Sequence, residues 1–305
     1  MSLFSQQLSR VLWPFGQFET YNRIEVSQSA IKHNLELFHN LQDAPAVIPV
    51  LKANAYGHGI RQVAKIIAAS KERWVPYMAV DSYYEAMQIR QVTDYPVLIM
   101  GMIRPYNFRR LKYKNFSFVV SDQMSIESLG KTGRNLKIHI ELNTGMNRYG
   151  VRPKEVTGLL EFMAKYPNLE LDGIMSHLAD SDGASEATIT KAVGLFDDTV
   201  VAIEALVGPV RYKHIAQTAG SVRARSAEAT SVRPGIGIFG VNPFTPSHPC
   251  YGRLAGLQPV MKFVSRIADI QEVPKGDGIS YNYTYHAAKP MRIGIIPIGY
   301  YEGVP

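Results

Sequence analysis

The chain has 305 residues, of which 46% are hydrophobic and 19% charged, which is an ordinary globular composition and too long for one small core. Its formal net charge of +7 suits phosphorylated or carboxylated small molecules as well as a polyanion. No apolar run is long enough to span a bilayer, and one cysteine excludes an intrachain disulfide framework, so we expect a cytoplasmic protein that binds no membrane.

The predicted elements begin with a strand, a Ser cap and an amphipathic helix in "YNRIEVSQSAIKHNLELFH". From Ala46 onward, short apolar runs alternate with helix-period segments such as "IRQVAKIIAAS", "DSYYEAMQIRQ", "PKEVTGLLEFMAKY" and "EATITKAVGLFDDTVVAIEAL". The strand candidates are "AVIPVL" at 46, "YMAV" at 77, "YPVLIM" at 95, "FSFVV" at 116, "LKIHIEL" at 136, "LDGIMSH" at 171, "YKHIA" at 212 and "VRPGIGIFG" at 232. Eight strands with helix-length connections predict an α/β fold, a (β/α)8 TIM barrel over residues 27–244. A doubly wound open sheet is the alternative.

After about Val241 the helix period ends, and apolar and polar residues alternate between Gly, Pro and Asp turn signals. We therefore predict a smaller antiparallel β domain over residues 245–305, with the N-terminal segment 1–26 packing against it. Because only about sixty residues follow the change and the last ones read as a turn, we expect the domain to be incomplete at its C-terminal end.

Four polar side chains stand at or just past the ends of predicted strands, where the active site of a barrel lies: Lys52, Glu141, His177 and Thr218. A lysine there can be a structural ion-pair member, a phosphate ligand or a covalent catalyst, and taken alone it favours an ion pair. The basic stretch "RPYNFRRLKYKNF" (Arg104–Phe116) is interpreted as a surface helix. No nucleic-acid motif accompanies it, so we expect no nucleic-acid binding.

Six segments resemble the alanine racemase family and occur in that family's order along the chain. They are "VLKANAYGHG", "HIELNTGMNRYGV", "GIMSHLADSD", "HIAQTAGSVR", "SVRPGIGIFG" and "GISYNYTY". The resemblance implies an isomerase that binds pyridoxal phosphate (PLP) in the barrel, needs no metal and interconverts L- and D-alanine. It further implies a homodimer whose active site is shared between subunits, with a role in D-alanine biosynthesis for the cell wall.

The resemblance also implies which residues bind the cofactor. Lys52 would hold it covalently, and His177 would stack on its pyridine ring as a neutral imidazole. The phosphate would be held by the hydroxyls of Tyr56 and Thr218 and by the backbone N–H groups of Gly235 and Ile236.

Arg233 would meet the pyridine nitrogen. A guanidinium donates a hydrogen bond but cannot protonate the ring, which favours racemisation over decarboxylation or transamination. Lys52 and Tyr281 would be the two acid/base groups, with Tyr281 supplied by the partner subunit. Tyr283 and Tyr285 stand nearby, but the preceding serine fits Tyr281 best.

Arg148 would bind the substrate carboxylate. Two positions depart from the family pattern. Glu141 stands where many members carry a carbon-dioxide-modified lysine that orients this arginine, and we expect the carboxylate to do the same work. Gln217 stands where asparagine is more common. His214 is expected either to hydrogen-bond near Arg233 or to be structural.

Three alternatives share parts of this pattern. A broad-specificity or serine-preferring racemase would have every motif and differ in its pocket. A decarboxylase of the same barrel is disfavoured by Arg233. A non-catalytic PLP carrier would need Lys52 but no β domain.

Overall fold

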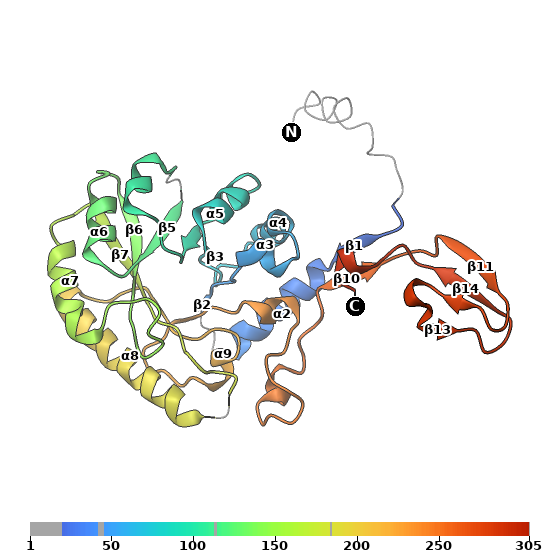
Figure 1. The fold of residues 1–305 in the computed structure, drawn as a ribbon. Helices are drawn as coiled ribbons and strands as arrows, with labels where there is room; N and C mark the ends of the chain where they lie inside the picture. Colours follow the sequence, from blue (N-terminus) through green and yellow to red (C-terminus); the bar gives the residue numbers. More distant parts are fainter. Residues whose placement is uncertain (1–19, 42–45, 113–114, 184, 305) are drawn as a thin grey trace. The chain divides into compact units, whose positions relative to one another are not determined.

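The computed structural model describes residues 20–41, 46–112, 115–183 and 185–304, and the chain divides into two compact units. The larger unit runs from Ser27 to Val260, and of the described residues the smaller one combines 20–26 with 261–304 (Figure 1).

The larger unit is built on parallel strands. Six of them form one sheet in chain order: β3 (Met78–Val80), β4 (Val97–Ile99), β5 (Phe116–Val120), β6 (Leu136–Glu141), β7 (Leu169–Met175) and β8 (Tyr212–His214). A parallel pair, β2 (Ala46–Val47) with β9 (Ser231–Val232), completes the set. Parallel bridges Val50–Ala79 and Gln217–Arg233 join this pair to the two ends of the sheet. The strands therefore form a closed ring of hydrogen-bonded neighbours, which confirms the predicted barrel.

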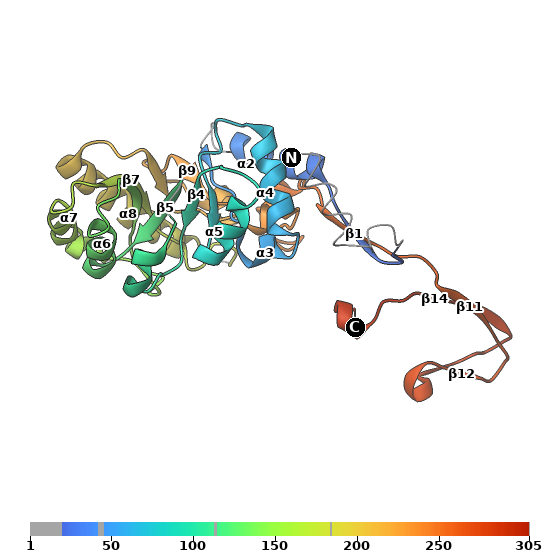
Figure 2. The same ribbon diagram turned by 90° about the horizontal axis from the view of Figure 1, so that it is seen from above.

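Helices cover the outside of the strands (Figures 1 and 2). Several begin at side-chain caps: Ser27 accepts from the N–H of Ala30, and Ser82 forms a capping box with Glu85. The strand, cap and helix predicted near the N-terminus are confirmed, with β1 at Arg23–Val26. The α-helices are α2 (Gln28–Asn40), α3 (Lys52–Tyr56), α4 (Ile60–Ser70), α5 (Tyr83–Arg90), α6 (Gln123–Gly130), α7 (Val156–Met163), α8 (Glu186–Val207) and α9 (Gly220–Arg223). Short 3₁₀ helices are η1 (Pro105–Arg110), η2 (Pro153–Glu155), η3 (Ile236–Phe239) and η4 (Tyr251–Leu254).

Two predicted elements were wrong in type. The strand expected over "VRPGIGIFG" ends at Val232 and gives way to η3, because Pro234 has no amide proton to continue the ladder. The surface helix expected over Arg104–Phe116 is the short 3₁₀ helix η1, followed by β5. Within η1 only Phe108 is buried, and one apolar anchor is too little to stabilise an α-helix by packing.

The smaller unit consists of antiparallel pairs, as predicted. β1 pairs with β10 (Met261–Val264), β11 (Asp269–Val273) with β14 (Met291–Ile295), and β12 (Gly278–Ile279) with β13 (Tyr285–His286). The 3₁₀ helices η5 (Tyr281–Tyr283) and η6 (Tyr300–Glu302) lie in the same unit. Among the described residues, no helix has the length and apolarity needed to cross a membrane.

Candidate active site

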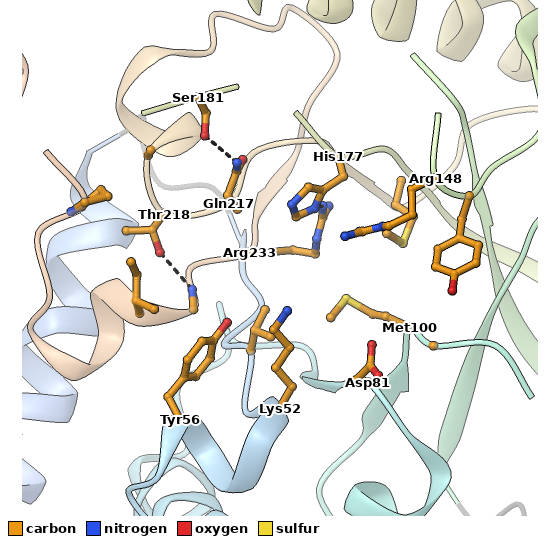
Figure 3. Close-up of a pocket in the computed structure, with 18 of the residues that line it drawn as sticks. Lys52, Tyr56, Asp81, Met100, Arg148, His177, Ser181, Gln217, Thr218 and Arg233 are labelled. Atoms are coloured by element: carbon orange, nitrogen blue, oxygen red, sulfur yellow. Dashed lines mark hydrogen bonds between the residues drawn. The ribbon is translucent and has the colours of Figure 1, made fainter. Parts of the chain in front are cut away.

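A cavity of about 450 Å³ opens where the parallel strands of the barrel end (Figure 3). It brings together side chains that follow different strands, as expected for the carboxyl end of a barrel. Of the residues predicted from the sequence, those lining it are Lys52, Tyr56, Glu141, Arg148, His177, Gln217, Thr218, Arg233, Gly235 and Ile236.

Lys52 starts a turn of unusual backbone. The four residues after it, Ala53 to Tyr56, all have positive φ, between 51° and 56°. Each non-glycine residue in the left-handed region costs about 1–2 kcal/mol, so the turn is held by its surroundings. The carboxylate of Glu85 accepts from the N–H of Ala53 at 2.7 Å, and Asn54 Oδ1 accepts from the N–H of Ile60 at 2.9 Å. The turn carries the exposed Lys52 side chain into the cavity.

Thr218, Tyr56 and Ile236 offer three hydrogen-bond donors to the cavity. Thr218 Oγ1 accepts from the N–H groups of Gly235 and Gly237, at 3.1 and 3.2 Å, which leaves its own proton free to donate. Burial raises the pKa of Tyr56, so its phenol stays protonated. The N–H of Ile236 makes no hydrogen bond to any described residue.

The backbone beside these donors has no room for side chains. A Cβ at position 235 would lie 2.4 Å from the Tyr56 hydroxyl, and one at position 237 would lie 2.4 Å from Phe38. Glycine at both positions therefore lets the chain approach the Tyr56 and Thr218 hydroxyls closely.

Arg233 is the charged centre of the site and is only 2% exposed. Nη1 donates to His214 Nδ1 at 2.6 Å and to the His214 carbonyl at 2.7 Å. Nη2 donates to the Ser176 carbonyl at 2.6 Å and to His177 Nδ1 at 3.3 Å. Burial lowers its pKa to about 10, so it is still a cation at neutral pH. Nε makes no hydrogen bond within the described chain, and its N–H remains free to donate.

His177 lies beside Arg233 in the cavity (Figure 3). Burial, together with the positive charges of Arg233, Arg148 and Lys52, lowers its pKa to about 3. Arg233 can only donate, so Nδ1 of His177 accepts and the ring proton sits on Nε2. His177 is thus a neutral aromatic plane at physiological pH.

Two family models match the chain: "Alanine racemase, N-terminal domain" over residues 26–243 and "Alanine racemase, C-terminal domain" over residues 260–305. The chain is 33% identical to alanine racemase 2 of Caldanaerobacter subterraneus over 92% of this chain and 73% of that one. The chain belongs to the alanine racemase family.

Solved structures of alanine racemases share the fold. The enzyme of Clostridium difficile 630 matches with a TM-score of 0.81 at 26% identity, covering 93% of this chain and 75% of that one. The enzyme of Bacillus anthracis, solved with bound L-Ala-P, matches with a TM-score of 0.78 at 28% identity, covering 94% and 75%.

In this chain the carboxylate of Glu141 is buried while the Arg148 side chain is exposed. Burial raises the pKa of Glu141, and the charges of Arg233 and Arg148 counteract that rise. No hydrogen bond or ion pair joins Glu141 to Arg148 in the described chain; Arg148 lies over the ring of Tyr149, 5.7 Å from its centroid. The expected orienting role of Glu141 stays a prediction.

Gln217 binds a neighbouring loop. Its Nε2 donates to Ser181 Oγ and to the carbonyl of Leu178 (Figure 3), whereas its buried Oε1 has no partner among the described residues. His214 does not line the cavity but lies behind Arg233, fully buried. Tyr281 opens η5 in the smaller unit, where its side chain is 81% exposed.

Sequence reasoning missed several residues of the cavity, among them Asp81, Met100, Ser181 and Asp182. Asp81 and Met100 directly follow β3 and β4. The strand-end rule that selected Lys52 could have found them. Ser181 and Asp182 lie in the loop after β7, where the sequence has no periodic signal.

Proposed function

We propose that this chain interconverts L- and D-alanine with pyridoxal phosphate in the barrel cavity and with Lys52 and Tyr281 as the two acid/base groups. The observation that carries the proposal is Arg233: a buried guanidinium whose two terminal nitrogens are bonded to the protein and whose Nε–H is free. Such a group can donate to a pyridine nitrogen without protonating it.

The donor set of the cavity fits the cofactor's phosphate. The hydroxyls of Thr218 and Tyr56 and the N–H of Ile236 are free donors around a glycine backbone that leaves no space for side chains. Neutral donors of this kind bind an anion without requiring a counter-charge. His177 supplies a neutral plane on which a pyridine ring can stack.

Lys52 is the one lysine among the residues lining the cavity, and its Nζ would bind the cofactor aldehyde. When bound, the cofactor withdraws electron density from Cα and makes the α-proton acidic. Lys52, displaced by the substrate amine, then takes or delivers a proton at one face of Cα. The positive side chain of Arg148, at the same cavity, would hold the substrate carboxylate.

Inversion needs a second group at the opposite face of Cα. We assign that role to Tyr281, contributed by the partner subunit in a homodimer. A tyrosine titrates near pH 10 when free, so its use as a base requires a partner that stabilises the phenolate. Arg148 is the candidate for that partner, because its side chain is exposed at the cavity. We also propose that the enzyme is cytoplasmic, because a chain with one cysteine fits a reducing compartment.

Covalent capture of the cofactor tests the proposal. The protein is incubated with PLP, reduced with borohydride and digested, and the peptides are weighed. We expect a phosphopyridoxyl adduct on Lys52, together with visible absorbance before reduction. Lys52→Ala should abolish both signals, while Lys65→Ala, an exposed lysine of α4, should retain both. An adduct spread over surface lysines, unaffected by Lys52→Ala, would refute the proposal.

A further inference from the structure

A line of buried polar side chains continues from Arg233 away from the cavity into the barrel. Nε2 of His214 lies 2.9 Å from Nδ1 of His139, on β6. Nε2 of His139 in turn faces Oδ2 of Asp172, on β7, at 4.0 Å, which is too long for a hydrogen bond. Nε2 of His139 is buried and has no hydrogen-bond partner among the described residues. These three side chains are at most 3% exposed. The mechanism assigns no role to His139 or Asp172.

The directions of the two hydrogen bonds that join Arg233, His214 and His139 follow from Arg233. Because a guanidinium has no acceptor, Nδ1 of His214 must accept, which puts the His214 proton on Nε2. That proton is donated to Nδ1 of His139, so the His139 proton also sits on Nε2. It faces the carboxylate of Asp172 across 4.0 Å, and the negative charge of that carboxylate favours a proton on Nε2.

Both rings are held neutral, which this arrangement requires. Burial lowers the pKa of His139 to about 3, against the opposing effect of Asp172. Burial and the charge of Arg233 lower that of His214 well below its usual value. The site is also shaped for the rings: a Cβ at position 173 would lie 2.2 Å from Nδ1 of His139, so only Gly173 admits the ring.

Two further donors hold the carboxylate of Asp172. The hydroxyl of Tyr77 donates to Oδ2, and Nζ of Lys137 donates to Oδ1 at 3.0 Å. Oδ1 therefore faces a cation, whereas Oδ2 accepts from the tyrosine and lies 4.0 Å from Nε2 of His139.

We propose that Asp172 is a positioning residue, which acts through the tautomers of His139 and His214 to keep Nδ1 of His214 open to Arg233. With the carboxylate of Asp172 beside Nε2 of His139, the ring protons of His139 and His214 both lie on Nε2, the nitrogen of each ring that points away from Arg233. Its importance for racemisation rests on the proposed function, but the tautomers themselves do not. An aspartate that fixes the tautomer of an imidazole can be essential for turnover even when its asparagine variant keeps the geometry.

Asp172→Asn is expected to reverse the tautomers of His139 and His214. Lys137 can only donate, so the amide oxygen turns toward Lys137 and the amide NH₂ replaces Oδ2 beside His139. An amide N–H would then face the Nε2–H of His139 where a negative charge stood before. This favours moving the His139 proton to Nδ1 and, through the hydrogen bond between the two rings, the His214 proton to Nδ1 as well. The His214 nitrogen that faces Arg233 would then carry a proton and could no longer accept.

The test is histidine ¹⁵N NMR of the cofactor-free protein, with ring signals of His139 and His214 assigned from their Gln variants. We expect both rings as the Nε2–H tautomer in the wild type and at least one as Nδ1–H in Asp172→Asn. The matched control, Tyr77→Phe, removes a donor to the same carboxylate but leaves the acceptor, and should keep the wild-type tautomers. In the loaded enzyme, kcat should fall by about 10-fold or more in Asp172→Asn and little in Tyr77→Phe.

Two results would overturn the inference: an Nδ1–H tautomer of either ring in the wild type, or unchanged tautomers in a folded Asp172→Asn. If the variant fails to fold, the wild-type spectrum can still refute the inference, since an Nδ1–H ring there excludes it. A failure of the proposed function is a separate result, namely no adduct on Lys52 in the wild type.

Discussion

The conformation of the Arg233 side chain is fixed by its hydrogen-bond partners. Its terminal nitrogens bond to His214 on β8 and to the carbonyl of Ser176, which directly follows β7. The guanidinium therefore cannot rotate, and only its Nε–H makes no hydrogen bond within the described chain. The sequence identified Arg233 by resemblance to a family segment. It could not identify Asp172 or the contact between His139 and His214, which are 75 positions apart, because such contacts depend on the pairing of strands and not on local pattern.

The buried neutral histidines predict how stability depends on pH. A group whose folded pKa is depressed binds more protons when unfolded, so stability is lost as pH falls below the unfolded value. For His177 that window runs from about pH 6.5 down toward 3. We expect the free energy of unfolding to fall by about 1.4 kcal/mol per pH unit for this residue across the window.

Urea denaturation of the wild type and His177→Gln at about pH 6.5 and pH 5 measures this loss. The variant should lose less stability on acidification than the wild type. Glu141, with its raised pKa, acts in the opposite direction but does so in both proteins, so the difference isolates His177. Equal losses in the two proteins would contradict the assignment of a buried neutral ring.

At the scale of elements, the barrel strands and most of the outer helices could be predicted because each has a periodic apolar pattern and several have side-chain caps. Elements without such a pattern could not. In the left-handed turn Ala53–Tyr56, alanine and tyrosine have positive φ angles, which only glycine adopts without strain. It exists because Glu85 and Asn54 hold its backbone, and those partners are known only once the fold is known.

This turn predicts an inverted response to glycine. Ala53→Gly should stabilise the protein by about 0.5–1 kcal/mol, because relief of the left-handed strain exceeds the entropy that glycine adds to the unfolded chain. Ala69→Gly, at an exposed site in the right-handed α4, should destabilise by about 0.5–1 kcal/mol. Urea midpoints at constant m-value report both changes. Loss of stability in Ala53→Gly would show that the turn is not strained.

At the scale of the whole molecule, the sequence separated an α/β barrel from an antiparallel β unit by a change of period. No apolar pattern distinguishes one tyrosine of the smaller unit from another, because Tyr281, Tyr283 and Tyr285 are all exposed. Only resemblance singles out Tyr281, and its role requires a second copy of the chain.

Mixing two inactive variants tests that requirement. Lys52→Ala and Tyr281→Phe should each be inactive alone. After unfolding and refolding together in equal amounts, half of the dimers are mixed, and each has one intact site if the site is shared. Activity should therefore return to about one quarter of the wild type. If Lys52 and Tyr281 act within one subunit, no mixed dimer has an intact site and the mixture stays inactive.

The most direct test of the central claim is proton NMR of L-alanine in heavy water with the purified protein and added pyridoxal phosphate. We predict that the α-proton signal disappears and that chiral chromatography of the same sample finds D-alanine, since Lys52 and Tyr281 would exchange protons with solvent at the two faces of Cα. An α-proton that stays unchanged, in a sample where Lys52 carries the cofactor, would contradict alanine racemisation by this chain.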